Sequence, residues 1–377
     1  MTRNALLTVF IVGCLTVPQL CAEDPLKNVT DLNRAGLQAH QQRDFDTAGA
    51  KFEQALEVVG YGQSGHEREA ISLLRNLFVV RRDQYRLPEA EQQSRKALQL
   101  AEKTFGPSHR TVRNIQSDLG EVLWMQGKSY EAISYFQRAL GATKGASDAS
   151  EDDLVRASAN LAVALRAVGQ QSKAIDLLKP IVADCRLRGA KTYNSGVAIN
   201  NLAMAMADLG EFQPAKELQT EAVEAFNAID AQLAKASALM NLAQIKILAG
   251  EHDEVETILD SSLKLLTANG EDNRPAAVQT LSLLGAHYFR AGQTERAEPL
   301  LGKAAQISQT YFYAGHPDTV ATLKLYSQVL KKLGRKKEAK QIAKQARAQE
   351  EQGNSAEHKV AQNVVDVKAL LNESAKR

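Results

Sequence analysis

Asparagine side chains recur at a nearly constant spacing through the middle of this 377-residue chain. Asn160, Asn201 and Asn241 follow one another at intervals of 41 and 40 residues, Asn76 lies two such intervals before Asn160, and Asn200 adjoins Asn201. An amide side chain offers both donors and an acceptor, which suits pairing with the backbone of an extended peptide. The alternative is that asparagine is merely a tolerated polar residue on the solvated face of a helix. The spacing alone leaves both interpretations open.

Arginine and tryptophan residues accompany the asparagines. We expect Arg82, Arg156 and Arg166 on the same face, where guanidinium groups could meet acidic groups. Trp124 is the only tryptophan of the chain. It suits a binding anchor, because tryptophan is enriched among the residues that contribute most to binding, and packing in the core is the alternative.

No spacing of residue types indicates catalysis, a metal site or a cofactor. The seven histidines are scattered, with no His-Glu-x-x-His pattern and no glycine-rich phosphate loop. His66, His109 and His316 fall in turns, where we expect a capping or structural role. Cys185 favours a buried inert thiol over a redox switch. We therefore expect a protein that is not an enzyme and needs no cofactor. The balance of 46 Lys+Arg against 44 Asp+Glu also argues against a nucleic-acid partner.

These candidate residues belong to a repeat with a period of about 42 residues. Each unit has a small pivot residue within a helical pattern, and the eight pivots are Ala48, Ala90, Ala132, Ala174, Ala215, Val255, Ala297 and Ala339. The asparagines of the series stand fourteen residues before a pivot. A glycine stands five residues before the pivot in six units, and a small residue stands twelve before it in seven.

This pattern predicts a pair of helices in each unit. A glycine can adopt the left-handed conformation that ends the first helix, and small residues let the two helices approach closely. Arg43 and Tyr85 replace the glycine in the first two units, so we expect other turn geometries there. Because one hairpin cannot bury its apolar face, neighbouring hairpins must stack on one another.

The glycine, leucine, alanine and small-residue positions resemble the tetratricopeptide repeat family over roughly residues 29–350. The usual unit of that family has about 34 residues, and the longer period here resembles the kinesin light chain type of repeat. The resemblance implies an all-α fold, a right-handed superhelix of about eight hairpins whose first helices line a concave groove. In related repeat proteins, asparagines on this inner face hold peptides. The resemblance thus implies peptide binding by Asn76, Asn160, Asn200, Asn201 and Asn241.

The two ends of the chain differ from the repeats. Residues 1–22 combine a short basic start with an apolar run that is too short for a comfortable membrane span, which indicates an export signal. Cleavage near Ala22 would give a periplasmic or secreted protein, while a lipoprotein at Cys14 and an uncleaved membrane anchor are the alternatives. We expect the repeat array to fill 23–350, and 351–377 to be a tail or a capping helix.

These features together predict an exported adaptor or assembly scaffold that binds a protein or an extended peptide in its groove. The alternative is an accessory or regulatory subunit that positions an enzyme of the cell envelope. Co-purification distinguishes them, because a scaffold should recover structural or transport proteins and a subunit should recover one enzyme. We expect no integral membrane span once the signal is removed.

Overall fold

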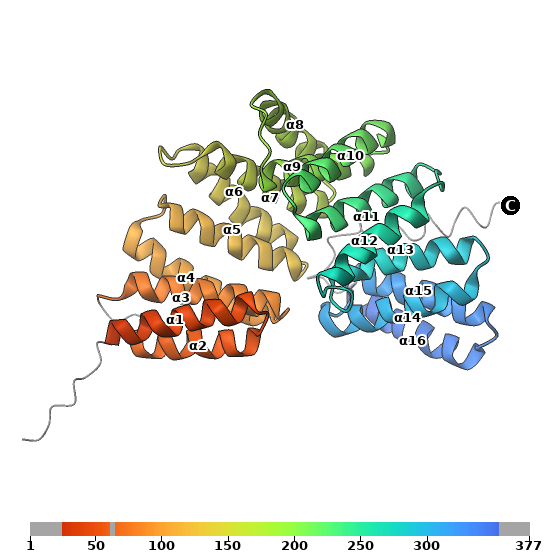
Figure 1. The fold of residues 1–377 in the computed structure, drawn as a ribbon, viewed down its shortest axis with the longest axis horizontal. Helices are drawn as coiled ribbons and strands as arrows, with labels where there is room; N and C mark the ends of the chain where they lie inside the picture. Colours follow the sequence, from red (N-terminus) through yellow and green to blue (C-terminus); the bar gives the residue numbers. More distant parts are fainter. Residues whose placement is uncertain (1–24, 61–64, 354–377) are drawn as a thin grey trace, which may run out of the picture.

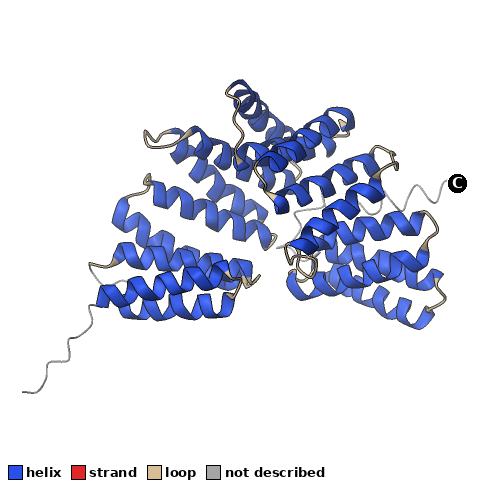
Figure 2. Cartoon of the chain, in the orientation of Figure 1, coloured by secondary structure: helices blue, strands red, loops and turns tan. Residues whose placement is uncertain are grey.

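The structure, a computed structural model, describes residues 25–60 and 65–353, and this part of the chain forms helices and their connections (Figures 1 and 2). The helices are α1 (Pro25–Gln41), α2 (Phe45–Val59), α3 (Glu67–Asp83), α4 (Leu87–Phe105), α5 (Arg110–Met125), α6 (Ser129–Lys144), α7 (Glu151–Ala167), α8 (Gln171–Leu187), α9 (Tyr193–Ala207), α10 (Phe212–Ala228), α11 (Gln232–Leu248), α12 (Val255–Ala268), α13 (Ala276–Arg290), α14 (Thr294–Tyr311), α15 (Pro317–Lys332) and α16 (Lys336–Gly353). Each odd-numbered helix pairs with the next helix, which gives eight hairpins, numbered 1 to 8 here. The predicted all-α solenoid of hairpins is confirmed.

The hairpins follow one another in chain order around an arc (Figure 1). From α5 to α15, each odd-numbered helix contacts the next one. Side-chain hydrogen bonds connect α1 to α3 and α3 to α5 in the same way. These first helices therefore form the inner surface of the array. None of the described helices is both long enough and apolar enough to cross a bilayer. The predicted signal at 1–22 lies outside the described residues, as does the predicted tail from residue 354 onward, because α16 runs to Gly353.

The pivot residues lie buried between the two helices of each hairpin. All eight have at most 6% of their surface exposed. The residue twelve before the pivot is small where the residue four after it is large. In hairpin 3 these two residues are Gly120 and Phe136, and a methyl group added to Gly120 would lie 2.6 Å from the Phe136 ring. Hairpin 2 reverses these sizes, since Phe78 stands on its first helix and Ser94 on its second, both buried. The two helices of a hairpin thus match each other in volume.

Arg43 and Tyr85 adopt the same turn conformation as the glycines. Their φ angles are 61° and 59°, in the left-handed region that Gly127 also occupies with 78°. In both turns the next residue donates its backbone N–H to the carbonyl five residues earlier, as Lys128 does in hairpin 3. Our expectation of other turn geometries was wrong. The turn is the same, and the backbone of these two residues is strained because L side chains rarely adopt this conformation.

Two of the turn histidines cap helices, as expected. The Nδ1 atoms of His109 and His316 accept hydrogen bonds from the backbone N–H groups of Thr111 and Asp318, at 3.2 and 3.1 Å. His66 also precedes a helix but makes no side-chain cap bond. Burial lowers the pKa of His316, so its ring is neutral and can accept this bond.

Candidate functional site

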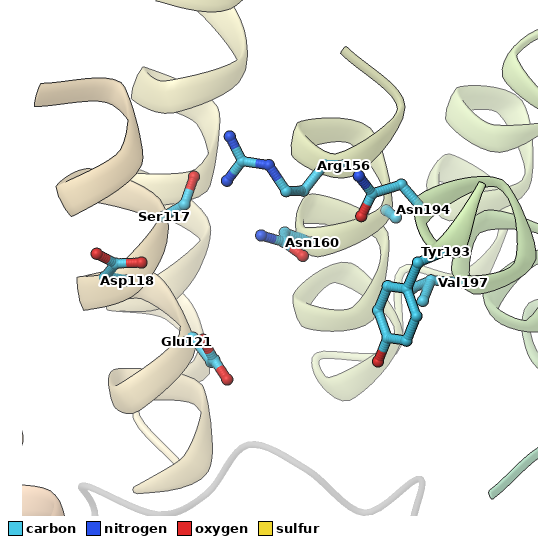
Figure 3. Close-up of a pocket in the computed structure, with 9 residues that line it drawn as sticks. Ser117, Asp118, Glu121, Arg156, Asn160, Tyr193, Asn194 and Val197 are labelled. Carbon is cyan, nitrogen blue, oxygen red and sulfur yellow. The ribbon is translucent and has the colours of Figure 1, made fainter. Parts of the chain in front are cut away.

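A polar cleft lies on the inner surface where hairpins 3, 4 and 5 meet (Figure 3). Its volume is about 350 Å³, and α5, α7 and α9 form its walls. The lining residues are Ser117, Asp118, Glu121, Arg156, Ala159, Asn160, Tyr193, Asn194 and Val197. Two of the nine, Arg156 and Asn160, are among the groove residues that the sequence analysis proposed.

One wall of the cleft carries two carboxylates on successive turns of α5. Asp118 accepts hydrogen bonds from Nε and Nη2 of Arg75, at 3.0 and 2.9 Å. Glu121 faces Arg82 at 3.3 Å. Desolvation raises the pKa of both carboxyl groups, although each arginine offsets part of this effect. Arg75 and Arg82 therefore compensate the charges of the two carboxylates. This wall presents hydrogen-bond acceptors with little uncompensated charge.

The opposite wall carries an amide and a guanidinium group from α7. Arg156 donates to the side-chain oxygen of Asn114 at 2.8 Å and lies 3.4 Å from Asp153. These contacts fix the guanidinium beside the cleft, where Figure 3 shows it above Asn160. Among the described residues, Asn160 has no hydrogen-bond partner for its amide, and it is half-buried. It is the one member of the asparagine series whose donors and acceptor are all open to a ligand.

Tyr193 closes the third side from the start of α9. Its side chain is exposed at 55%, while its ring packs 5.8 Å from that of Phe226. Desolvation raises the pKa of its hydroxyl, which stays a neutral donor at physiological pH. Asn194 next to it donates to Asp152 at 2.5 Å. The cleft thus adds a fixed aromatic surface to its polar groups.

The remaining asparagines connect neighbouring hairpins. Asn76 donates to the side chain of Asn33 at 2.8 Å, from α3 to α1. Asn201 is only 5% exposed and donates to the carbonyl of Ala159 at 3.2 Å, from α9 to α7. The peptide-binding hypothesis expects Asn160, Asn201 and Asn241 to be solvated in the free protein. For Asn201 that expectation is wrong, because the backbone of the preceding hairpin is its partner.

Asn200 is the centre of a larger polar cluster between hairpins 5 and 6. Its side-chain oxygen accepts from Nε2 of Gln219 at 2.8 Å and from Nδ2 of Asn241 at 2.9 Å. Its own amide donates to Asn201 at 3.2 Å. Gln219 is fully buried and also donates to the carbonyl of Ala238. Asn200, Asn201 and Asn241 therefore share their hydrogen-bonding groups with one another, and they do not line the cleft.

Arg82 and Arg166 meet acidic groups of their own chain. Arg166 on α7 donates to Asp208 at the end of α9 at 2.9 Å. Desolvation raises the pKa of Asp208, and Arg166 offsets part of the effect. Arg82 bonds Asp83 and faces Glu121 of the next hairpin. Both arginines thus connect adjacent first helices, and Arg82 acts on the cleft through Glu121.

Trp124 occupies the repeat position of Arg82 and Arg166, eight residues before the pivot. Arg166 pairs with Asp208, which stands seven residues before the next pivot, and the corresponding residue in the hairpin after Trp124 is Ala167. Trp124 therefore faces no acidic residue at that position, and the residue is 40% exposed. The core-packing alternative is therefore wrong. A solvent-accessible indole at this inner-helix position agrees with the anchor prediction, which no contact in the structure tests.

Seven lining residues were missed in the sequence: Ser117, Asp118, Glu121, Ala159, Tyr193, Asn194 and Val197. Asp118 stands fourteen residues before its pivot, so it occupies the asparagine position of hairpin 3. That register was a usable signal. Tyr193 and Asn194 lie about two turns nearer the start of their helix than Asn201 does, and only the offset between adjacent hairpins brings them to Asn160. Within the described residues, no group of His, Cys, Asp and Glu side chains is arranged to hold a metal ion.

Two solved structures are similar to this chain in fold, and a third matches about half of it. The apo form of the quorum sensor NprR from B. thuringiensis has 14% identity and a TM-score of 0.59, covering 86% of this chain and 87% of its own. A Rap protein complexed with competence and sporulation factor has 13% identity and a TM-score of 0.56, covering 94% and 99%. Repeats of a putative kinesin light chain from Podosopora anserina have 20% identity and a TM-score of 0.43, covering 55% and 99%.

Sequence models of one repeat family match several hairpins of this chain. No curated protein matches the chain. The sequence model of the tetratricopeptide repeat matches at residues 68–145, 112–186, 234–310 and 277–351, and a second model of this repeat matches at 196–227. These matches extend over more than half of the chain and coincide with the observed hairpins. The chain therefore belongs to the tetratricopeptide repeat family.

Proposed function

We propose that this protein is a non-enzymatic adaptor that binds an extended segment of a partner protein in the cleft of hairpins 3 to 5. The observation that carries the proposal is Asn160, whose amide is open, whereas Asp118, Arg156 and Asn194 are bonded to other residues of the chain. Such an amide can accept from a backbone N–H of the partner and donate to a backbone carbonyl. The export signal in 1–22 would place this binding outside the cytoplasm.

The cleft suits a peptide backbone better than a charged small ligand. Its carboxylates are compensated by Arg75 and Arg82, so neither sign of charge prevails in the wall of α5. Packed helices lie roughly 8–10 Å apart, so the cleft spans about 20 Å between the axes of α5 and α9. About six residues of extended chain cover that length, at roughly 3.3 Å per residue. Tyr193 and Trp124 would contact the apolar side chains of the segment, one at each side of Asn160.

Known proteins of the same fold agree with a binding role. The Rap protein noted above was solved in complex with competence and sporulation factor. We infer that an array of this fold and comparable extent can hold a ligand, and we propose the cleft of hairpins 3 to 5 as the place in this chain.

Selection from a library of random peptides of about eight residues, with the full chain as bait, tests the proposal. The selected peptide should bind the wild-type chain and lose affinity in Asn160→Ala. The loss should be about 2- to 13-fold, the equivalent of one net hydrogen bond of roughly 0.5–1.5 kcal/mol. Arg156→Ala should weaken binding as well.

Asn227→Ala is the matched control, because Asn227 is an exposed asparagine on the outer helix α10. Its peptide affinity should equal that of the wild type. Equal affinities for the Asn160→Ala and Asn227→Ala variants would remove the cleft as the binding site.

A further inference from the structure

The turns of the first three hairpins face the later hairpins (Figure 1), and side chains of the two parts meet there. Arg43, in the turn of hairpin 1, donates to Glu271 at 2.5 Å, and the two residues are separated by 228 positions in the sequence. Glu271 lies in the connection from α12 to α13, together with Arg274. Glu271 is largely buried, with 13% of its side chain exposed, so this ion pair is partly shielded from water.

Arg274 contacts the same turn of hairpin 1 as Arg43 does. Its guanidinium lies 5.6 Å from the ring centre of Phe45, and that of Arg43 lies 5.7 Å from the same ring. Arg274 also donates to the backbone carbonyl of Asp83 at the end of α3. Arg274, in the connection that leads from α12 to α13, thus contacts both hairpin 1 and hairpin 2.

Aromatic residues continue the contact toward hairpin 3. The ring of Tyr85, in the turn of hairpin 2, meets that of Tyr311 edge to face at 5.5 Å. Burial raises the pKa of Tyr85 to about 12, so the hydroxyl is neutral here. A methyl group at Gly127, in the turn of hairpin 3, would lie 2.5 Å from the hydroxyl of Tyr313. This turn therefore has to be glycine for a second reason besides its φ angle.

The other turns make no such contact. A methyl group would meet no atom within 4 Å at Gly169, Gly210, Gly250, Gly292 or Gly334. Two of the hairpin turns have a strained residue, Arg43 or Tyr85, where the others have glycine. The side chains of these two residues contact the later hairpins. The departure from the repeat pattern and the long-range contact thus occur in the same residues.

We propose that Arg43, Tyr85 and Gly127, together with Glu271, Arg274, Tyr311 and Tyr313, form a clasp that closes the superhelix into a ring. The cleft of hairpins 3 to 5 lies on the arc between the two halves that the clasp joins. A partner segment reaches the inner surface from the side only when the clasp opens. This second statement, the gating of the cleft, rests on the function proposed above, whereas the clasp itself does not.

The double variant Arg43→Gly and Tyr85→Gly tests the clasp. Glycine restores the residue that the other turns use, so both hairpins should fold at least as well as in the wild type. Small-angle X-ray scattering should show a larger radius of gyration and a longer maximum dimension, with unchanged helix content by circular dichroism. Arg274→Ala, which acts from the opposite side, should give the same expansion.

Asp230→Gly is the matched control. Asp230 also has a positive φ of 55°, but its contacts are with its own turn. Its scattering should match that of the wild type. Unchanged dimensions of the double variant and of Arg274→Ala would overturn the clasp. So would an equal expansion of Asp230→Gly, because the effect would then come from turn flexibility.

The peptide selected against the wild-type chain tests the gating. Its association rate constant should rise in the double variant and stay at the wild-type value in Asp230→Gly. Equal association rates in all three proteins would overturn the gating. Scattering needs no peptide, so a failure of the proposed function leaves the result on the clasp intact.

Discussion

Asn200→Ala should destabilise the array far more than Asn160→Ala, although both residues are asparagines on inner helices. Removing the oxygen of Asn200 leaves one N–H of the fully buried Gln219 without its acceptor. A stranded buried donor costs about 1–3 kcal/mol. The lost bond from Asn241 adds about 0.5–1.5 kcal/mol, since its half-buried amide can recover water. We therefore expect about 2–4 kcal/mol for Asn200→Ala, and within about 0.5 kcal/mol of the wild type for Asn160→Ala.

Hydrogen exchange measures this difference where it should occur. Contacts in a repeat array are mainly between neighbours, so the loss of protection should concentrate in α9 to α11. Amides of hairpins 1 and 8 should exchange at wild-type rates and serve as internal controls. Equal loss of protection in the two variants would refute the assignment of Asn200 to stability and of Asn160 to binding.

Three further predictions concern packing, pH and export. Gly120→Ala should lower the free energy of unfolding by about 1–3 kcal/mol, because the added methyl group would clash with the Phe136 ring. Gly141→Ala should raise it by about 0.5–1 kcal/mol, because its methyl group would meet no other atom. Urea unfolding measures both changes. Desolvation raises the pKa of Glu121, so the folded chain binds its proton more tightly than the unfolded chain. Its contribution to stability is then largest below about pH 4.3 and is lost as pH rises through the folded pKa. Glu121→Gln should reduce this acid-side gain in unfolding experiments across pH. N-terminal sequencing of the native protein should find a first residue near Glu23, and a cytoplasmic chain beginning at its first methionine would contradict export.

The hairpins were predictable because burial repeats with the sequence period. Ala132 and Ala215 are fully buried pivots, as their neighbours in the pattern required. The turn glycines were recognisable because a positive φ favours glycine. The turn at Tyr85 was not, because the contact with Tyr311 that favours the exception comes from a residue far away in the sequence.

The roles of the asparagines were only partly predictable. Asn160 and Asn201 stand at the same repeat position, yet one is open and the other is bonded to Ala159. The difference depends on which polar groups of the adjacent hairpin lie beside each asparagine, and the repeat period does not determine those groups. Likewise, Asn200 became a structural centre because Gln219, rather than an apolar residue, faces it from α10. A periodic pattern identifies a position on a helix, while its partner is decided by the residues around it.

The reversed sizes in hairpin 2 set the smallest unit that recombination between repeats can exchange. A chimera that carried α3 in place of α5 would oppose Phe78 to Phe136, two large rings in one narrow crossing. The reciprocal exchange would oppose Gly120 to Ser94 and leave a void. Exchanging α3 together with α4 keeps each volume with its complement. Shuffling, duplication or loss of repeats in this chain should therefore be tolerated in whole hairpins and rejected in single helices.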